Sequence, residues 1–117
     1  MADSITDFGI PNCDTVKKAR KWLDAQSVSY DFHDYKKKGI DEDTLNAWCK
    51  ELGWEALVNR RGTTWRKLDD AQKADLNQAT AVSLMQEHTS LIKRPVVQTK
   101  NTLMLGFNAE EFESNLL

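Results

Sequence analysis

The sequence predicts an α/β fold, and two patterns within its 117 residues support this prediction. Residues 5–33 read as strand, helix and strand, which is a βαβ unit with a right-handed crossover. Residues 95–116 read as two strands joined by a tight turn and followed by a helix. The length suits one domain that buries a core without disulfides or metals, so we expect a single domain over residues 1–117.

Hydrophobic patterning predicts each element of the first half. Residues 5–10 carry apolar side chains that do not alternate cleanly, which is typical of a strand covered on both faces. Residues 15–26 follow with an apolar stripe at helical spacing. Residues 28–33 then alternate between apolar and polar side chains, which predicts a half-buried strand. The lysines and glycine of residues 36–39 are expected to form a solvated turn.

A helix with complete start and stop signals is predicted after residue 40. Asp41 can cap its N-terminus, Ile40 and Leu45 are spaced as a hydrophobic staple, and Gly53 can end it. Cys49 falls on the apolar stripe of this helix. We therefore interpret Cys49 as a core residue and not as a second reactive thiol.

The patterns of the second half are less regular. Residues 54–68 are expected to form a short helix, a loop and a short extended or turn segment, and helices are predicted over residues 70–76 and 80–88. Pro95 can begin a strand, because the first residue of a strand need not donate a backbone hydrogen bond to the neighbouring strand. Residues 102–107 predict the returning strand of a hairpin, and Asn108 starts a capping pattern for the last helix.

Composition and charge exclude several classes of protein. The formal net charge of −2 gives no general attraction for nucleic acid or for an anionic membrane. No stretch approaches the apolar length of a membrane span, and the first four residues do not resemble a leader, so we expect a cytoplasmic protein. The two cysteines form no C-x-x-C motif and share no ligand spacing with His33 or His88, so neither a disulfide framework nor a metal site is expected.

Cys13 is the leading candidate for chemistry because it lies where the first strand meets the first helix. Helix N-termini present unpaired N–H groups and a positive partial charge, which favour a thiolate over a thiol. The cations within residues 17–21 act in the same direction, and Asp14 acts against them. The alternative is a buried structural cysteine, but the polar, proline-containing turn around Cys13 favours the functional interpretation.

The order of elements, with a cysteine at the start of the first helix, is thioredoxin-like in outline. Four segments then resemble one family: residues 9–20, 30–35, 59–68 and 92–96. In this order they resemble the arsenate reductase and Spx family of thioredoxin-like proteins (ArsC-like), and most closely its small YffB-type branch. The resemblance implies a mixed four-stranded sheet with flanking helices, a helical insertion after the second strand, and Cys13 as the single nucleophile.

The same resemblance implies a substrate site around the cysteine. Arg94 would precede a cis proline, Pro95, which lies beside the catalytic sulfur in such folds and presents its backbone to a thiol substrate. Without the resemblance, Arg94 reads as a strand-edge cation. A second arginine is matched to Arg61, although Arg60 is adjacent and one gap would exchange the two. The expected anion- or substrate-binding residues are Arg94, Arg61, Pro95 and Asn12.

The chain departs from the pattern of true arsenate reductases and of Spx. Arsenate reductases carry a third arginine on the strand after the cis proline, whereas residues 103–107 contain none, and they carry a histidine at or next to the position of Gly9. An apolar side chain cannot replace the directed hydrogen bonds of a guanidinium to an oxyanion. The Spx branch carries C-x-x-C, whereas Val16 stands three residues after Cys13 and excludes a dithiol switch within the motif.

The leading expectation is a glutathione-dependent thiol reductase, a thiol-disulfide oxidoreductase in which an outside thiol resolves a mixed disulfide on Cys13. It would need no metal and no bound cofactor, with glutathione as co-substrate. One alternative is arsenate reductase-like oxyanion reduction, and the other is a non-catalytic Spx-like regulator that binds the RNA polymerase alpha subunit. We expect a monomer that takes glutathione or another thiol or disulfide and binds neither nucleic acid directly nor a membrane.

Overall fold

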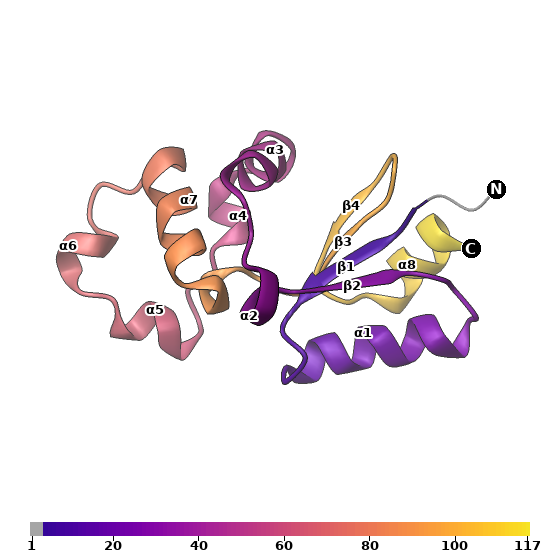
Figure 1. Ribbon diagram of the computed structural model, residues 1–117. Helices are drawn as coiled ribbons and strands as arrows, with labels where there is room; N and C mark the ends of the chain where they lie inside the picture. Colours follow the sequence, from indigo (N-terminus) through magenta and orange to yellow (C-terminus); the bar gives the residue numbers. More distant parts are fainter. Residues whose placement is uncertain (1–3) are drawn as a thin grey trace. The chain divides into compact units, whose positions relative to one another are not determined.

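The structure, a computed structural model, describes residues 4–117, which divide into two compact units (Figure 1). The first unit combines the described residues up to Lys38 with Arg94–Leu117, and the second is Gly39–Lys93. The first three residues, on which part of the leader expectation rests, lie outside the described residues. The expectation of a single domain stays a prediction.

A mixed four-stranded sheet forms the first unit, in the order β2-β1-β3-β4. Strand β1 (Thr6–Gly9) pairs in parallel with β2 (Asp31–Asp34) and antiparallel with β3 (Val96–Gln98), and β3 pairs antiparallel with β4 (Leu103–Leu105). The parallel pair is the one that the βαβ pattern predicts, and the antiparallel pair β3–β4 is the predicted hairpin. The expected sheet architecture is confirmed.

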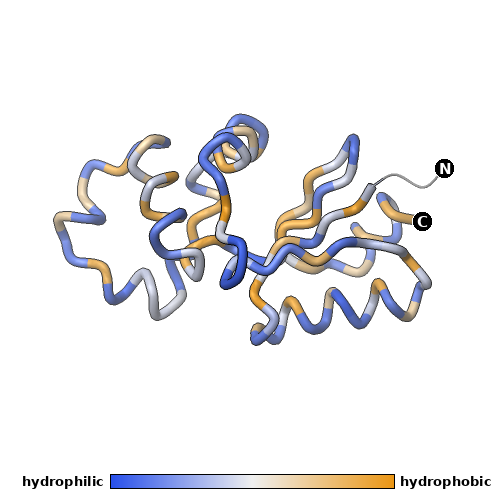
Figure 2. Tube along the Cα trace, viewed as in Figure 1, coloured by the Kyte–Doolittle hydropathy of each residue, from blue (hydrophilic) through white to orange (hydrophobic). Residues whose placement is uncertain are grey.

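Two helices pack on one face of this sheet, α1 (Asp14–Ala25) and α8 (Ala109–Leu116). The apolar side chains of α1 recur at helical spacing, as the hydropathy colours in Figure 2 show. The ring of Phe112 on α8 meets the ring of Trp22 on α1 edge-on, with centroids 5.5 Å apart. The buried core between sheet and helices consists of Ile5, Ala19, Leu23, Val97, Met104 and Phe112.

Gly9 lets α1 lie close to the end of β1. A Cβ atom at this position would lie 2.8 Å from Cγ2 of Val16, closer than side-chain atoms approach one another. Any larger residue would therefore require the Val16 side chain or the first turn of α1 to shift. The absence of a side chain at Gly9 thus leaves room for Val16 in the helix turn that follows Cys13.

The second strand begins later than the alternation predicts, and the expected solvated turn is an exposed one-turn helix. Ser27 has a positive φ of 57°, and the N–H of Val28 bonds the carbonyl of Leu23, so the chain leaves the helix in a turn before pairing starts at Asp31. Residues Tyr35–Lys38 form a one-turn helix, α2. The Asp34 carboxylate accepts the N–H of Lys36 at 2.9 Å, which stabilises the start of this turn.

The second unit is a helical insertion, as expected, and its helices are α3 (Glu42–Leu52), α4 (Trp54–Leu57), α5 (Thr63–Lys67), α6 (Asp70–Lys73) and α7 (Gln78–Glu87). The predicted caps of α3 are confirmed: Asp41 accepts the N–H of Thr44 at 2.7 Å, and Gly53 ends the helix with a φ of 88°. Helix α3 packs against α7.

Two expectations for the second unit are wrong in detail. Thr63–Lys67 is helical where an extended or turn segment is expected, and the N–H of Arg66 bonds the carbonyl of Gly62 at its start. The helix expected over residues 70–76 is the single turn α6, because the chain turns away at Asp75, whose φ is 53°. Thr89–Leu91 then forms a short 3-10 helix that leads to the first unit.

Candidate thiolate site

Cys13 is the N-cap residue of α1, as the sequence predicts. It is extended, with φ of −125° and ψ of 127°, and its carbonyl accepts the N–H of Lys17 at 2.9 Å to begin the helix. Its side chain is partly exposed, so a substrate can reach the sulfur. The residues before it, Pro11 and Asn12, are both exposed.

The surroundings of Cys13 favour the thiolate. Partial burial raises the pKa of the thiol, but the backbone N–H groups of Val16 and Thr15 and the positively charged guanidinium of Arg94 together lower it by more. The net pKa of Cys13 is therefore below its ordinary value. This is the direction expected for a reactive cysteine at a helix start.

Arg94 lies beside Cys13, and the peptide bond that joins Arg94 to Pro95 is cis. Pro95 is buried, and its carbonyl accepts the N–H of Gly106 at 2.8 Å, which holds the chain at the start of β3. The structure thus brings together Arg94 and Cys13, which are far apart in sequence, and confirms the expected cis proline. Whether Arg94 and Pro95 bind a substrate stays a prediction.

Arg61 and Arg60 lie in the second unit, in the loop between α4 and α5. The guanidinium of Arg60 lies 5.8 Å from the ring centre of Trp54 and 5.7 Å from that of Trp65. The N–H of Arg61 instead bonds the side chain of Asn59 at 3.1 Å, and Arg61 is exposed. Both arginines line a polar cavity of about 370 Å³ in this unit, together with Glu55, Val58, Asn59 and Lys93.

Cys49 is buried on α3, with 5% of its side chain exposed. Burial raises the pKa of this thiol, opposite to the direction for Cys13. Both cysteines are free. The prediction that Cys49 is a core residue is confirmed.

Two ionisable residues of the first unit escaped the sequence analysis. Asp7 on β1 is 0% exposed, and burial raises its pKa to about 7 although the charge of Arg20 acts against this. Tyr35 on α2 is 2% exposed; burial raises its pKa, the charge of Asp7 raises it further, and the charge of Arg94 lowers it. An acid inside a strand expected to be covered on both faces was the available signal for Asp7.

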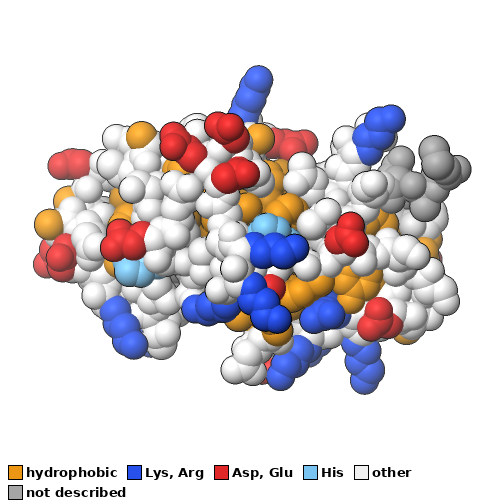
Figure 3. All heavy atoms as spheres, in the orientation of Figure 1, with side chains coloured by type: hydrophobic (Ala, Val, Ile, Leu, Met, Phe, Trp, Pro, Cys, Tyr) orange, Lys and Arg blue, Asp and Glu red, His pale blue; other side chains and the backbone are white. Residues whose placement is uncertain are grey.

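Part of the surface of the first unit, over α1 and α2, is basic. Lysine and arginine side chains gather over α1 and α2 on the face seen in Figure 3, and the cations of these helices are Lys17, Lys18, Arg20, Lys21, Lys36, Lys37 and Lys38. Within residues 4–117, no three His, Cys, Asp or Glu side chains are grouped closely enough to hold a metal ion. Across the same residues, every helix is too short or too polar to cross a bilayer.

Comparisons with known proteins agree with this architecture. A solved structure described as a YFFB protein has 50% identity and a TM-score of 0.95, over 97% of this chain and 100% of that one. An arsenate reductase (ArsC) related protein from Brucella melitensis has 46% identity and a TM-score of 0.75, over 96% of this chain and 93% of that one.

Sequence relatives extend the comparison. An uncharacterized protein of Haemophilus influenzae is 44% identical over 94% of this chain and 96% of its own length. The global transcriptional regulator Spx of Streptococcus mutans is 27% identical over 96% of this chain and 82% of its own length. The model of the ArsC family matches residues 8–115. With that match across nearly its whole length, the chain belongs to the ArsC family.

Proposed function

We propose that the protein is a cytoplasmic, glutathione-dependent thiol reductase in which Cys13 is the nucleophile. The observation that supports this most directly is the contact of the Arg94 guanidinium with the Cys13 sulfur at the N-terminus of α1. A cation and two backbone N–H groups around one accessible sulfur are what a reactive thiolate requires. The ArsC family also includes proteins described as arsenate reductases or related to them.

The proposed reaction has two exchange steps. The Cys13 thiolate attacks one sulfur of a disulfide between glutathione and a second thiol; a Cys13–glutathione bond forms, and the second thiol leaves as a thiolate that takes a proton from water. The thiolate of another glutathione then attacks the glutathione sulfur of this mixed disulfide. Oxidised glutathione leaves, and Cys13 returns as a thiolate that Arg94 stabilises.

Resolution by an outside thiol follows from the burial of the second cysteine. The chain has two cysteines, and Cys49 belongs to the second unit and is buried on α3. A buried thiol with a raised pKa is a poor nucleophile because little of it is ionised near neutral pH. Glutathione is therefore proposed as co-substrate, and no metal or bound cofactor is needed for this chemistry.

Pro95 and Asn12, in the first unit, are proposed to hold the substrate, and Arg61, in the second unit, is proposed to bind an anion. Arg61 is favoured over Arg60 as the anion-binding cation because the guanidinium of Arg60 already lies against two tryptophan rings. A guanidinium pairs well with a carboxylate, and glutathione carries two carboxylates. The exposed Asn12, next to Cys13, can offer a side-chain amide to the substrate backbone.

The alternative function is that of a non-catalytic regulator. The similarity to the regulator Spx over 96% of this chain supports this alternative. Under that alternative, the proposed partner is the RNA polymerase alpha subunit. The N-terminal motif here has valine at the position where a second cysteine would make a C-x-x-C pair. Such a regulator would therefore bind without a dithiol switch in that motif.

The test is exposure of the purified protein to oxidised glutathione, followed by mass spectrometry of the intact chain and of its peptides. We expect one glutathione on Cys13, no adduct in Cys13→Ser, and an unchanged adduct in the matched variant Cys49→Ala. Absence of an adduct on the wild-type protein would contradict the reductase proposal and favour the binding module. Turnover with a glutathione mixed disulfide and reduced glutathione then measures catalysis.

A further inference from the structure

Positive charge is concentrated in one part of the first unit, from Asp14 to Lys38. This segment carries seven lysines and arginines against four acids, so it has three excess positive charges in a chain whose formal net charge is −2. The rest of the chain therefore carries five excess negative charges. The segment is a local source of positive potential on a protein that is otherwise acidic.

The topology of the sheet brings this segment to the thiolate site. Strands β1 and β2 are parallel, and Gly9, the last residue of β1, pairs with Asp34, the last residue of β2. Both strands therefore end at the same edge of the sheet. From β1 the chain passes through residues 10–12 to Cys13, and from β2 it passes directly into α2. Figure 1 shows α2 and the start of α1 at this edge.

Two lysines follow Cys13 along α1 at intervals of one helical turn. Lys17 and Lys21 are four residues apart, so they lie on one side of the helix, about 6 Å and about 12 Å beyond Cys13 along its axis. Both are exposed, and neither makes an ion pair within residues 4–117. Their charges are therefore available to a partner.

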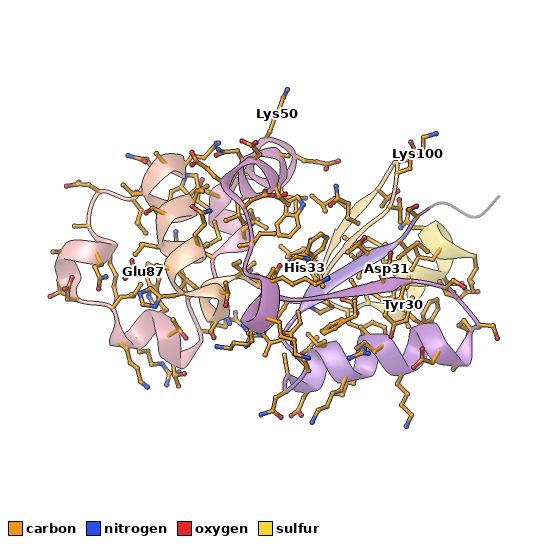
Figure 4. All side chains as sticks on the ribbon, in the orientation of Figure 1. Tyr30, Asp31, His33, Lys50, Glu87 and Lys100 are labelled. Atoms are coloured by element: carbon orange, nitrogen blue, oxygen red, sulfur yellow. The ribbon has the colours of Figure 1, made fainter. Side chains whose placement is uncertain are left out.

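Further lysines extend this positive surface around α1 and onto α2. They are exposed and make no ion pair among the described residues. Arg20 is engaged within the unit, since its Nε donates to the Tyr30 hydroxyl at 3.2 Å and its guanidinium lies 4.1 Å from the ring centre of Phe32. Figure 4 shows Tyr30 on the side of β2 toward α1. The residues that we call the basic surface are Lys17, Lys18, Lys21, Lys37 and Lys38.

We propose that the basic surface docks an acidic polypeptide segment, so that the substrate is a glutathionylated cysteine of a protein with acidic residues near that cysteine. The reaction rests on the proposed function: the Cys13 thiolate attacks the glutathione sulfur, a Cys13–glutathione bond forms, and the protein thiolate leaves and takes a proton from water. The docking does not depend on that reaction. An extended peptide rises about 3.3 Å per residue, so acids two and four positions from the substrate cysteine match the spacing of Lys17 and Lys21.

An acidic polypeptide fits this surface better than a nucleic acid does. The lysines lie next to a thiolate, and cysteines of polypeptides supply the disulfides that such a thiolate attacks. A nucleic acid carries a phosphate charge at every nucleotide and gains affinity by neutralising many of them. The segment offers three excess positive charges, and the five excess negative charges elsewhere repel a long polyanion. A short acidic segment needs to meet only the basic surface.

The first experiment measures the single-turnover rate at which Cys13 takes glutathione from glutathionylated model peptides, by mass spectrometry of the intact chain. One peptide has glutamate two and four positions from its cysteine on both sides, and the matched peptide has glutamine there. We expect the glutamate peptide to react about tenfold faster at low ionic strength, and this ratio to fall to about threefold or less in Lys17→Gln/Lys21→Gln. Using the ratio of the two peptides cancels any effect of the lysines on the thiol itself.

Lys100→Gln is the matched control for this experiment. Lys100 is an exposed cation that Figure 4 shows at the tip of the β3–β4 hairpin, and its loss should leave the wild-type ratio unchanged. Equal wild-type rates with the two peptides would overturn the docking proposal and leave the reductase proposal standing. Absence of glutathione transfer from both peptides would contradict the reductase proposal, and the second experiment then decides the docking.

The second experiment measures docking without reaction. The glutamate peptide, with serine in place of its cysteine, is titrated into 15N-labelled protein, and amide shifts are followed by NMR. We expect shifts concentrated in the first two turns of α1 and in α2, their loss at about 0.5 M salt, and an affinity about fivefold lower in Lys17→Gln/Lys21→Gln. Shifts that salt leaves unchanged, or shifts confined to other elements, would overturn the proposal. Tighter binding of a short DNA duplex to the same amides would contradict the choice of an acidic polypeptide.

Discussion

Replacing Asp7 with asparagine should stabilise the protein at neutral and alkaline pH. The folded pKa of about 7 exceeds the ordinary value of 3.8, so the folded state holds a proton that the unfolded state releases as the pH rises. Stability is therefore highest below about pH 4, falls between pH 4 and pH 7, and is constant above that range with respect to this group. At 1.36 kcal/mol for each pKa unit, the difference of about 3.2 is worth about 4 kcal/mol.

Asp7→Asn removes this loss of stability at higher pH, because the asparagine amide does not ionise. Between pH 5 and pH 8, the free energy of unfolding of Asp7→Asn relative to wild type should rise by about 3 kcal/mol, because wild-type folding is opposed by the proton that Asp7 must hold from pH 5 up to its folded pKa of about 7. The offset at pH 5 reflects the packing of the amide, so the pH-dependent part isolates the titration of Asp7.

The assay is urea unfolding at several pH values, followed by the fluorescence of the four tryptophans. Taking the difference between variant and wild type cancels the titration of all groups that the two proteins share. Asp24→Asn, which removes an exposed acid from α1, provides the control and should show little change with pH. A free-energy difference between Asp7→Asn and wild type that is the same at pH 5 and pH 8 would refute the reasoning.

Two further predictions concern the second cysteine and the substrate. Cys49→Ala should lose about 1 kcal/mol or more of stability, because it leaves a cavity in the core of the second unit, yet it should keep the thiol chemistry of Cys13. Chemical denaturation measures the stability, and iodoacetamide labelling measures the thiol chemistry. Rapid labelling of Cys49 in the native protein would contradict its assignment to the core. The wild type should reduce a glutathione mixed disulfide better than arsenate, because β4 offers no third guanidinium and each missing charge-assisted hydrogen bond costs roughly 1.5–3 kcal/mol. Leu105→Arg is expected to reduce the difference between the rates on the two substrates. Equal wild-type rates on the mixed disulfide and on arsenate in coupled assays would contradict the predicted preference for the disulfide.

Local sequence signals predicted the features that depend on neighbouring residues. The N-cap Asp41 and the terminal Gly53 of α3 are recognisable because capping uses a side chain and a backbone conformation within one turn. The burial of Cys49 followed from its place on an apolar stripe. Cys13 at the start of α1 was predictable for the same reason, since a strand, a turn and a helix follow one another directly.

Features that depend on distant parts of the chain were predicted through the family resemblance or not at all. No local pattern brings Arg94 to Cys13, because this contact arises from the pairing of β1 with β3. The one-turn helix α2 begins where the Asp34 side chain accepts a backbone N–H. The three consecutive lysines that follow favour the prediction of a turn, so the sequence does not indicate this helix. The burial of Asp7 requires knowing that β1 is central, between β2 and β3.

The most direct test of the central claim, that Arg94 holds Cys13 as a thiolate, is a titration of thiolate absorbance in wild type, Arg94→Ala and the matched control Lys93→Ala. Lys93 is the adjacent exposed cation, and it does not appear among the groups that act on the sulfur. We predict a midpoint below the usual value of about 8.5 in wild type and in Lys93→Ala, and a higher midpoint in Arg94→Ala. A wild-type midpoint at or above about 8.5, or an Arg94→Ala midpoint equal to that of wild type, would contradict the account.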